Sequence, residues 1–349
     1  MTKLGFEFLK LPLLDKKDEH SVDHAVLNSL VDLFIEKGGK YFYTAFTYHG
    51  GASEEAIRLS LVERYPRSSF ILSDKLPSWL IRNSEDCQKI FEKQLSRCGV
   101  DFFDIYMLQW LNEANYLNAE FCGAFDFLKK LKSEGKIIKS GFSFHDSPKL
   151  LDKILEKHPE IDCVQLQINY LDWESPALRA KECYKVAEKH GKEVIAMEPL
   201  KGGLLEKHGV SPSLSLRFAE NFPLVKYVLV NSVLPEYFEN DGSLSENEIS
   251  VLEKTASAIR SEKSVPCIGC SDCTELCPVK IPVHKYFEIY NEYCLNPEES
   301  WKIEPAYSSL TRSFSRPSDC LRCRICEQSC PQKINIAETL TIYTATDKV

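Results

Sequence analysis

Two segments in the last quarter of the sequence carry eight cysteines in one repeated spacing. Each segment reads C-x2-C-x2-C-x3-C followed by a proline, which is Pro278 in the first and Pro331 in the second. Three thiolates separated by two residues can bind one iron-sulfur cubane, and the proline after the fourth cysteine directs that cysteine towards another cluster. The spacing therefore predicts two [4Fe-4S] clusters, each with three ligands from one segment and one from the other.

The spacing also assigns the eight ligands to two sets. The first cluster is predicted to use Cys267, Cys270, Cys273 and Cys330, and the second Cys320, Cys323, Cys326 and Cys277. Two structural zinc sites are the alternative, but they would leave the repeated x3-Cys-Pro ending unexplained. The six other cysteines are scattered and are expected to be small core residues: Cys87, Cys98, Cys122, Cys163, Cys183 and Cys294.

The cysteine segment resembles the bacterial two-cluster ferredoxins. An insert, residues 278–319, separates its two motifs, and Val283, Tyr286, Phe287 and Tyr290 recur within it at helical spacing. This insert makes the segment more similar to the α-helical ferredoxin modules of larger redox enzymes. Because oxygen destroys accessible clusters, we expect an anaerobic host.

Length and charge limit the classes of protein to consider. The chain has 349 residues, which favours one large domain and one small domain. Its net charge of -8 argues against nucleic acid or an anionic membrane as a partner. It lacks an apolar run of the ~20 residues that a membrane helix needs, and Glu7 interrupts the N-terminal segment where an export signal is apolar. We therefore expect a cytoplasmic protein, in which cysteines bind metal rather than form disulfides.

Ahead of the cysteines, short apolar runs alternate with amphipathic stretches. Eight strands are expected, at 4–9, 41–45, 70–73, 103–108, 137–142, 163–168, 193–197 and 225–230. Helices are expected between them, at 22–36, 54–64, 84–97, 119–132, 148–157, 176–190 and 211–220. Eight such units predict a (β/α)8 TIM barrel, with a doubly wound open sheet as the alternative. That alternative is disfavoured because no G-x-G-x-x-G or Walker A motif occurs. We place the barrel at residues 1–258 and a small, mainly helical ferredoxin-like domain at 259–349.

Functional residues of a (β/α)8 barrel lie at the carboxyl ends of its strands. In this sequence those ends carry Tyr43, Tyr48, Lys75, Gln109, Ser143, His145, Gln165, Asn169, Met197, Glu198 and Asn231. Around them the chain resembles the aldo-keto reductases, in particular the branch with a C-terminal ferredoxin domain. The resemblance rests on YFYTAFTYHGG (41–51), SDK (73–75), DIYMLQ (104–109), KSGFSFH (139–145), VQLQINY (164–170) and MEPLKGG (197–203).

The resemblance implies a catalytic tetrad of Asp, Tyr, Lys and His. Tyr48 and Lys75 match the Tyr and Lys, whereas Tyr43 replaces the Asp and Gln109 replaces the His. In the family's chemistry the tyrosine gives a proton to a carbonyl oxygen, and the lysine ammonium lowers the tyrosine pKa. Gln109 can still donate a hydrogen bond to a substrate. Lys75 is expected to lose its carboxylate partner, because position 43 is a tyrosine.

The cofactor site implied by the resemblance is incomplete. Ser143, Gln165 and Asn169 match positions that contact the nicotinamide in the family, and Met197 stands where an aromatic residue commonly stacks on it. The segment after the eighth strand is short and has no Arg or Lys between Lys226 and Lys254 to meet a phosphate. Binding of NAD(P) is therefore left open.

Three functions follow. We favour an iron-sulfur oxidoreductase that moves electrons between two clusters and a small-molecule substrate at the barrel mouth, with a ferredoxin or other redox protein as partner. The second is an NADPH-dependent carbonyl reductase with structural clusters. The third is a non-catalytic electron carrier or partner-binding subunit built on a degenerate barrel. Family analogy carries much of this ranking.

Overall fold

The computed structural model describes residues 2–15, 18–175, 178–238, 243–261, 265–295 and 303–341. The chain divides into two compact units. The first contains Met1–Leu200 and Val210–Ser250, and the second contains Lys201–Gly209 and Val251–Val349. The segment that directly follows the seventh strand therefore belongs to the unit that carries the cysteine motifs.

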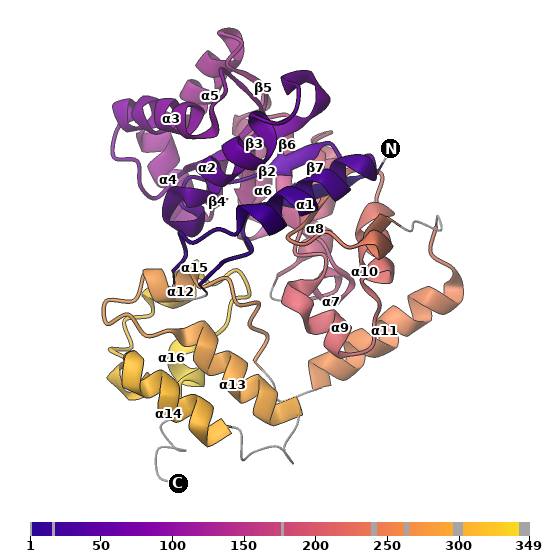
Figure 1. Cartoon of the computed structure of the whole chain (residues 1–349), viewed down its shortest axis with the longest axis vertical. Coiled ribbons are helices and arrows are strands. Elements are labelled where there is room, and N and C mark those ends of the chain that lie inside the picture. The colour runs from indigo at the N-terminus through magenta and orange to yellow at the C-terminus, as the bar shows by residue number, and fades with distance from the viewer. Residues whose placement is uncertain are drawn as a thin grey trace. The chain divides into compact units, whose positions relative to one another are not determined.

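The first unit is a closed barrel of eight parallel strands in sequence order (Figure 1). The strands are β1 (Leu4–Glu7), β2 (Tyr41–Tyr43), β3 (Ile71–Pro77), β4 (Phe103–Leu111), β5 (Ile137–Phe144), β6 (Cys163–Gln167), β7 (Glu193–Met197) and β8 (Val225–Val230). Pairing of Leu4 with Val228 joins β1 to β8 and closes the barrel. The predicted TIM-barrel fold is confirmed.

Helices follow most strands. They are α1 (His24–Glu36), α2 (Ala52–Ile57), α3 (Ser84–Cys98), α4 (Glu113–Phe121), α5 (Ala124–Ser133), α6 (Pro148–Lys157), α7 (Tyr170–Trp173), α8 (Ala180–Lys189), α10 (Pro212–Glu220) and α11 (Glu246–Ser261). The helix expected at 119–132 is two helices, because Gly123 adopts φ +69° between α4 and α5. Local signals set other boundaries. Asp23, for example, accepts hydrogen bonds from the first backbone N–H groups of α1.

Aromatic rings fill the barrel interior beneath the strand ends. The interior cluster contains Tyr41, Tyr43, Ile105, Met107, Cys163, Ile195, Met197 and Leu229. Tyr41 stacks on Tyr227 with ring centroids 4.1 Å apart. A Cβ on Gly5 would lie 2.4 Å from Cδ1 of Tyr41, so glycine is required for this ring to reach the interior. The packed layer supports the polar groups at the ends of β1, β2 and β3.

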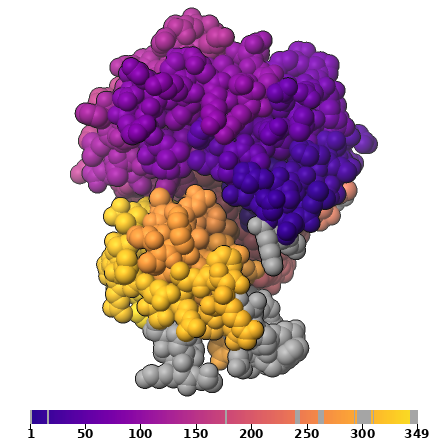
Figure 2. All heavy atoms as spheres, turned by 60° about the vertical axis from the view of Figure 1, so that its left-hand side comes forward, coloured from indigo at the N-terminus to yellow at the C-terminus, as the bar shows by residue number. Residues whose placement is uncertain are grey.

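The second unit is mainly helical, as predicted. Its helices include α9 (Leu204–Lys207), α12 (Asp272–Glu275), α13 (Val283–Leu295), α14 (Ile303–Ser313), α15 (Ile325–Ser329) and α16 (Ile336–Thr339). The helix expected in the insert is α13, and it buries Val283, Tyr286 and Phe287 in this unit's core. The segments with the two cysteine motifs, orange and yellow in Figure 2, lie against each other through α12 and α15. No helix among the described residues is both long and apolar enough to cross a membrane.

Candidate metal centres and candidate active site

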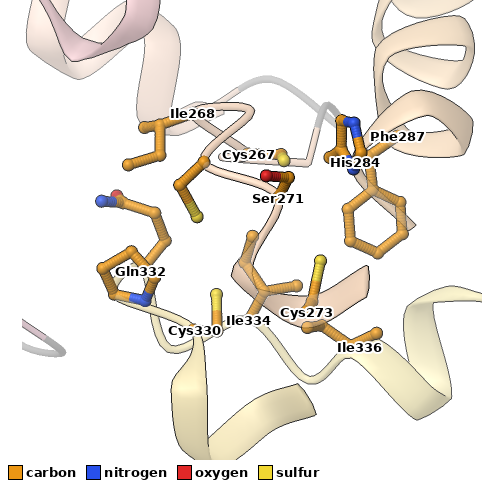
Figure 3. Close-up of a pocket in the computed structure, with 12 residues that line it drawn as sticks. Cys267, Ile268, Ser271, Cys273, His284, Phe287, Cys330, Gln332, Ile334 and Ile336 are labelled. Atoms are coloured by element: carbon orange, nitrogen blue, oxygen red, sulfur yellow. The ribbon is translucent and has the colours of Figure 1, made fainter. Parts of the chain in front are cut away.

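The cysteines of the second unit surround two cavities. The first cavity is lined by Cys267, Cys270, Cys273 and Cys330, and the sulfur atoms of Cys267, Cys273 and Cys330 point into it (Figure 3). Three of these residues come from the first motif and Cys330 comes from the second. A short turn of helix, α12, carries Cys273 and places it beside the loop with the other two cysteines.

The second cavity has the reciprocal composition. It is lined by Cys320, Cys323 and Cys326 of the second motif together with Cys277 of the first. The structure thus groups the eight cysteines into the same two sets of four that the spacing assigns. Their role as cluster ligands stays a prediction. No group of three or more His, Cys, Asp or Glu side chains in the described part of the chain is arranged to hold a single metal ion.

Polar side chains beside the first cavity can form hydrogen bonds that would stabilise an electron-rich iron-sulfur cluster. Gln332 lines this cavity, and its buried Nε2 has no hydrogen-bond partner among the described residues. An amide N–H in this position can donate to a cluster sulfur. The Gln332 Oε1 atom accepts a hydrogen bond from Nζ of Lys201, which is 2% exposed. The residues present at the first cavity therefore fit a [4Fe-4S] cluster.

The loop that carries Lys201 packs tightly on the first motif. A Cβ on Gly202 would lie only 2.8 Å from the carbonyl oxygen of Ile268, and the backbone of Gly202 has φ +66°. Ile268 lies between Cys267 and Gly269 and lines the first cavity. On another side His284 Nδ1 lies 3.1 Å from Thr274 Oγ1, and burial lowers the pKa of His284 to about 4. His284 is therefore neutral near pH 7.

In the barrel, Lys75 is the centre of a buried hydrogen-bond network. Its side chain is at the end of β3 and only 4% exposed. Lys75 Nζ donates to the hydroxyl of Tyr48 at 2.9 Å and also to the hydroxyl of Tyr43. Tyr43 in turn donates to Gln165 Oε1 at 2.9 Å. The structure thus brings together Tyr48, Lys75 and Gln165, through the hydroxyl of Tyr43.

Glu7 completes this network and was missed by the sequence analysis. The Tyr48 hydroxyl donates to Glu7 Oε1 at 3.1 Å. Burial raises the pKa of Glu7, and the positive charge of Lys75 is the largest effect in the opposite direction. Lys75 therefore has a carboxyl group nearby despite the tyrosine at position 43. The available signal was an acidic residue at the end of β1, directly opposite Tyr43 in the pairing with β2.

The two phenols of the network are neutral. Burial raises the pKa of Tyr43 well above its usual value, with Glu7 adding to the rise. Burial likewise raises the pKa of Tyr48, and Tyr43 and Glu7 add to it. Lys75 favours a phenolate on Tyr48, whereas an ionised Glu7 opposes it.

The other predicted barrel residues have separate surroundings. Ser143 Oγ accepts a hydrogen bond from Trp110 N at 2.7 Å. Asn169 caps α7 by accepting from Asp172 N at 2.8 Å, and its Nδ2 donates to Glu198 O at 2.9 Å. Gln109 is on β4, paired with Pro77, and its buried Oε1 has no partner among the described residues. Gln109 thus has a buried amide oxygen without a partner among the described residues, whereas Ser143 and Asn169 make hydrogen bonds within the barrel.

Two family models match the chain. Residues 14–241 match the aldo/keto reductase family, and residues 266–335 match the 4Fe-4S dicluster domain. Among related sequences, an aldo-keto reductase of Mycolicibacterium smegmatis is 26% identical over 236 residues, covering 64% of this chain and 80% of that protein. An uncharacterised oxidoreductase of Bacillus subtilis, YtbE, is 29% identical over 126 residues, covering 36% of this chain and 41% of that protein.

Solved structures show the same barrel. An aldo-keto reductase from Bacillus halodurans in its holo form aligns with a TM-score of 0.58 and 19% identity, covering 72% of this chain and 91% of that one. An aldo-keto reductase from Klebsiella pneumoniae in complex with NADPH aligns with a TM-score of 0.56 and 18% identity, covering 73% of this chain and 90% of that one. The chain belongs to the aldo/keto reductase family and carries a 4Fe-4S dicluster domain at its C-terminal end.

Proposed function

We propose that this protein is an iron-sulfur oxidoreductase that moves electrons between two [4Fe-4S] clusters and a small-molecule substrate at the barrel mouth. The observation that carries the proposal is the grouping of eight cysteines around two cavities, four to each, in a chain whose barrel keeps the Lys75–Tyr48 hydrogen bond. Bound clusters would supply one-electron transfer, which an aldo-keto reductase barrel alone does not provide.

The barrel residues would carry out the proton chemistry. Tyr48 donates its proton to a substrate carbonyl oxygen, and the Lys75 ammonium stabilises the phenolate that this step leaves. Gln109 lies on β4, next to the strand of Lys75, and the N–H of its amide would donate a hydrogen bond to the same oxygen. Reduction of a carbonyl group to an alcohol takes up two electrons, and two clusters that carry one electron each match that number.

Reoxidation of the reduced protein tests this function. The reconstituted protein is reduced with dithionite without oxygen, freed of excess reductant and mixed with a panel of carbonyl and enone compounds. We expect at least one compound to restore the visible absorbance of oxidised clusters, and Tyr48→Phe to slow this recovery by roughly 100-fold. Tyr293→Phe is the control, since Tyr293 is an exposed tyrosine outside the barrel. No recovery with any compound would contradict the proposal.

A second candidate is an NADPH-dependent carbonyl reductase with structural clusters. The specific observation in its favour is the likeness of the barrel to the Klebsiella pneumoniae structure, which contains NADPH. Ser143 and Asn169, which the resemblance places at nicotinamide contacts, make hydrogen bonds within the barrel that a bound nicotinamide would have to share or replace. Fluorescence titration with NADPH separates the two candidates, because this second function requires binding and substrate turnover that leave the clusters' absorbance unchanged.

A further inference from the structure

The carboxyl group of Glu7 is joined to Tyr48 from the side opposite to Lys75. We propose that Glu7 holds the proton that replaces the one Tyr48 gives to the substrate, which makes it a positioning residue that acts through Tyr48. This inference rests on the function proposed above. The contact spans two strands, because Glu7 ends β1 and Tyr48 follows β2, and the two atoms lie 3.1 Å apart.

The network has two branches from Lys75, one through Tyr43 and one through Tyr48. The branch through Tyr48 ends on a group that can move a proton. Lys75 donates to Tyr43 and to Tyr48, and each phenol passes its own hydrogen bond onward. Tyr43 donates to the amide oxygen of Gln165, which does not titrate near neutral pH. Tyr48 donates to the carboxyl of Glu7, which can gain and lose a proton. A proton can therefore be supplied to Tyr48 from Glu7, whereas the branch through Tyr43 ends on an amide that cannot supply one.

The charges around Glu7 favour a carboxyl that gains and loses a proton. Burial raises its pKa, and the positive charges of Lys75 and Lys10 limit the rise. Among the described residues, Tyr41 and Tyr43 on β2 and Tyr48 after it also face Glu7, and all three are neutral phenols. A carboxyl so placed holds its proton to a higher pH than an exposed glutamate does.

The protonation state of Glu7 sets the direction of the Tyr48 hydrogen bond. An ionised Glu7 can only accept, so Tyr48 keeps its proton turned towards β1 and away from a substrate. A protonated Glu7 can donate to the Tyr48 oxygen, which leaves the Tyr48 proton free to point at a substrate oxygen. The protonated form is therefore the one that supports reduction.

Reduction of the carbonyl carbon takes up two electrons, which bound clusters would supply, and one proton from solvent. The Tyr48 O–H bond breaks as the substrate O–H bond forms, and the Glu7 O–H bond breaks as the Tyr48 O–H bond is restored. Glu7 is left as a carboxylate near the Lys75 ammonium and regains its proton from solvent before the next turnover.

Infrared difference spectroscopy of the holoprotein tests the inference without any turnover. Protein labelled with 13C-glutamate should show a protonated carboxyl band below the raised pKa that disappears as the pH rises. The band should be missing in Glu7→Gln and retained in Glu55→Gln, an exposed glutamate given the same substitution. Absence of a Glu7-dependent band at every pH at which the protein stays folded would overturn the proposal.

Reoxidation of the reduced protein by a substrate is the second readout. The wild-type rate should be constant at low pH and fall as the pH rises through the Glu7 pKa. Glu7→Gln should be slower by roughly 100-fold at low pH and lose this pH dependence, whereas Glu7→Asp should retain it. An unchanged rate and pH profile in a folded Glu7→Gln protein would overturn the proposal. If no substrate reoxidises the wild type, the proposed function fails, and the infrared band still shows whether Glu7 holds a proton.

Discussion

The two cysteine cavities share one motif but differ in their surroundings. In the first cavity Cys273 is 7% exposed and Cys330 is 8% exposed, and the buried Lys201 and Gln332 lie beside it. Two residues of the second cavity are more accessible: Cys323 is exposed and its neighbour Leu321 is 65% exposed. Burial, nearby charge and hydrogen bonds to sulfur all change the reduction potential of a cluster. Identical ligand spacing therefore does not imply identical clusters.

The different exposure of the two cavities suggests that they have separate roles in electron transfer. An external electron carrier needs close approach, so the second cavity, with its exposed Cys323, is the expected point of entry. Lys201, four residues after the end of β7, donates a hydrogen bond to Gln332 of the first cavity, and this buried cation favours the more negatively charged, reduced form of a cluster there. We expect electrons to pass from the second cavity to the first.

Replacement of a single cysteine ligand should have the largest effect, because it should remove one cluster and leave the other. Because Cys330 lies in the second motif but lines the first cavity, Cys330→Ser should remove the first cluster and spare the second. Cys277→Ser should do the reverse. Iron content should fall from about eight to about four atoms per chain in each variant. Electron paramagnetic resonance of the reduced proteins identifies which signal is lost. Loss of the same signal from Cys330→Ser and Cys320→Ser would contradict the crossed assignment.

The two clusters should be lost at different rates, because their cysteine ligands differ in exposure to solvent. During exposure to a ferricyanide oxidant with a chelator, the cluster in the second cavity should be lost first, several times faster than the other, because Cys323 is exposed whereas Cys273 and Cys330 are buried. Signals of the two clusters, recorded at intervals by electron paramagnetic resonance, measure this order. Equal rates would show that the difference in exposure has no consequence.

Removal of the buried charge should alter one potential. Lys201→Met is expected to lower the potential of the first cluster by on the order of 59 mV, a tenfold change for a one-electron couple. The second cluster should be unaffected. Lys207→Met is the matched control, since Lys207 is exposed on the same segment. A redox titration followed by electron paramagnetic resonance measures both potentials, and equal shifts in the two clusters would argue against a local effect of Lys201.

The smallest expected effect concerns packing of the Lys201 loop. Gly202→Ala should destabilise the second unit by about 1–3 kcal/mol, because its Cβ would meet Ile268 O at 2.8 Å. Gly203→Ala is the matched control: Gly203 also has positive φ, at +91°, but nothing lies within 4 Å of its Cβ. Thermal unfolding of both variants isolates the steric contact from backbone strain. Equal losses would mean that contact with Ile268 contributes nothing.

The cysteine sets were predictable because their geometry is local. Two residues between successive cysteines fix the course of the chain, and the prolines after Cys277 and Cys330 direct these residues to the other cavity. The strand order was likewise predictable from alternating patterns. The end of β3 could not be predicted in this way. The strand was expected to end at residue 73, but it continues to Pro77, which pairs with Gln109.

The barrel network was predictable only in part. Tyr48 and Lys75 could be found by resemblance, but Glu7 contacts Tyr48 across 41 positions of sequence, and no spacing rule reports such a contact. It depends on the register of β1 against β2, which places Glu7 opposite Tyr43. The packing of Lys201 beside Gln332, 131 positions away, escaped prediction for the same reason.

The most direct test of the central claim is a single turnover. Protein reduced at both clusters is mixed without oxygen with a substrate that reoxidises it, and cluster absorbance and product are measured in the same samples. We expect one molecule of alcohol for every two clusters oxidised, with both processes slowed together in Tyr48→Phe. Oxidation of the clusters without product, or product formation that leaves the clusters reduced, would contradict the transfer of electrons from the clusters to a substrate in the barrel.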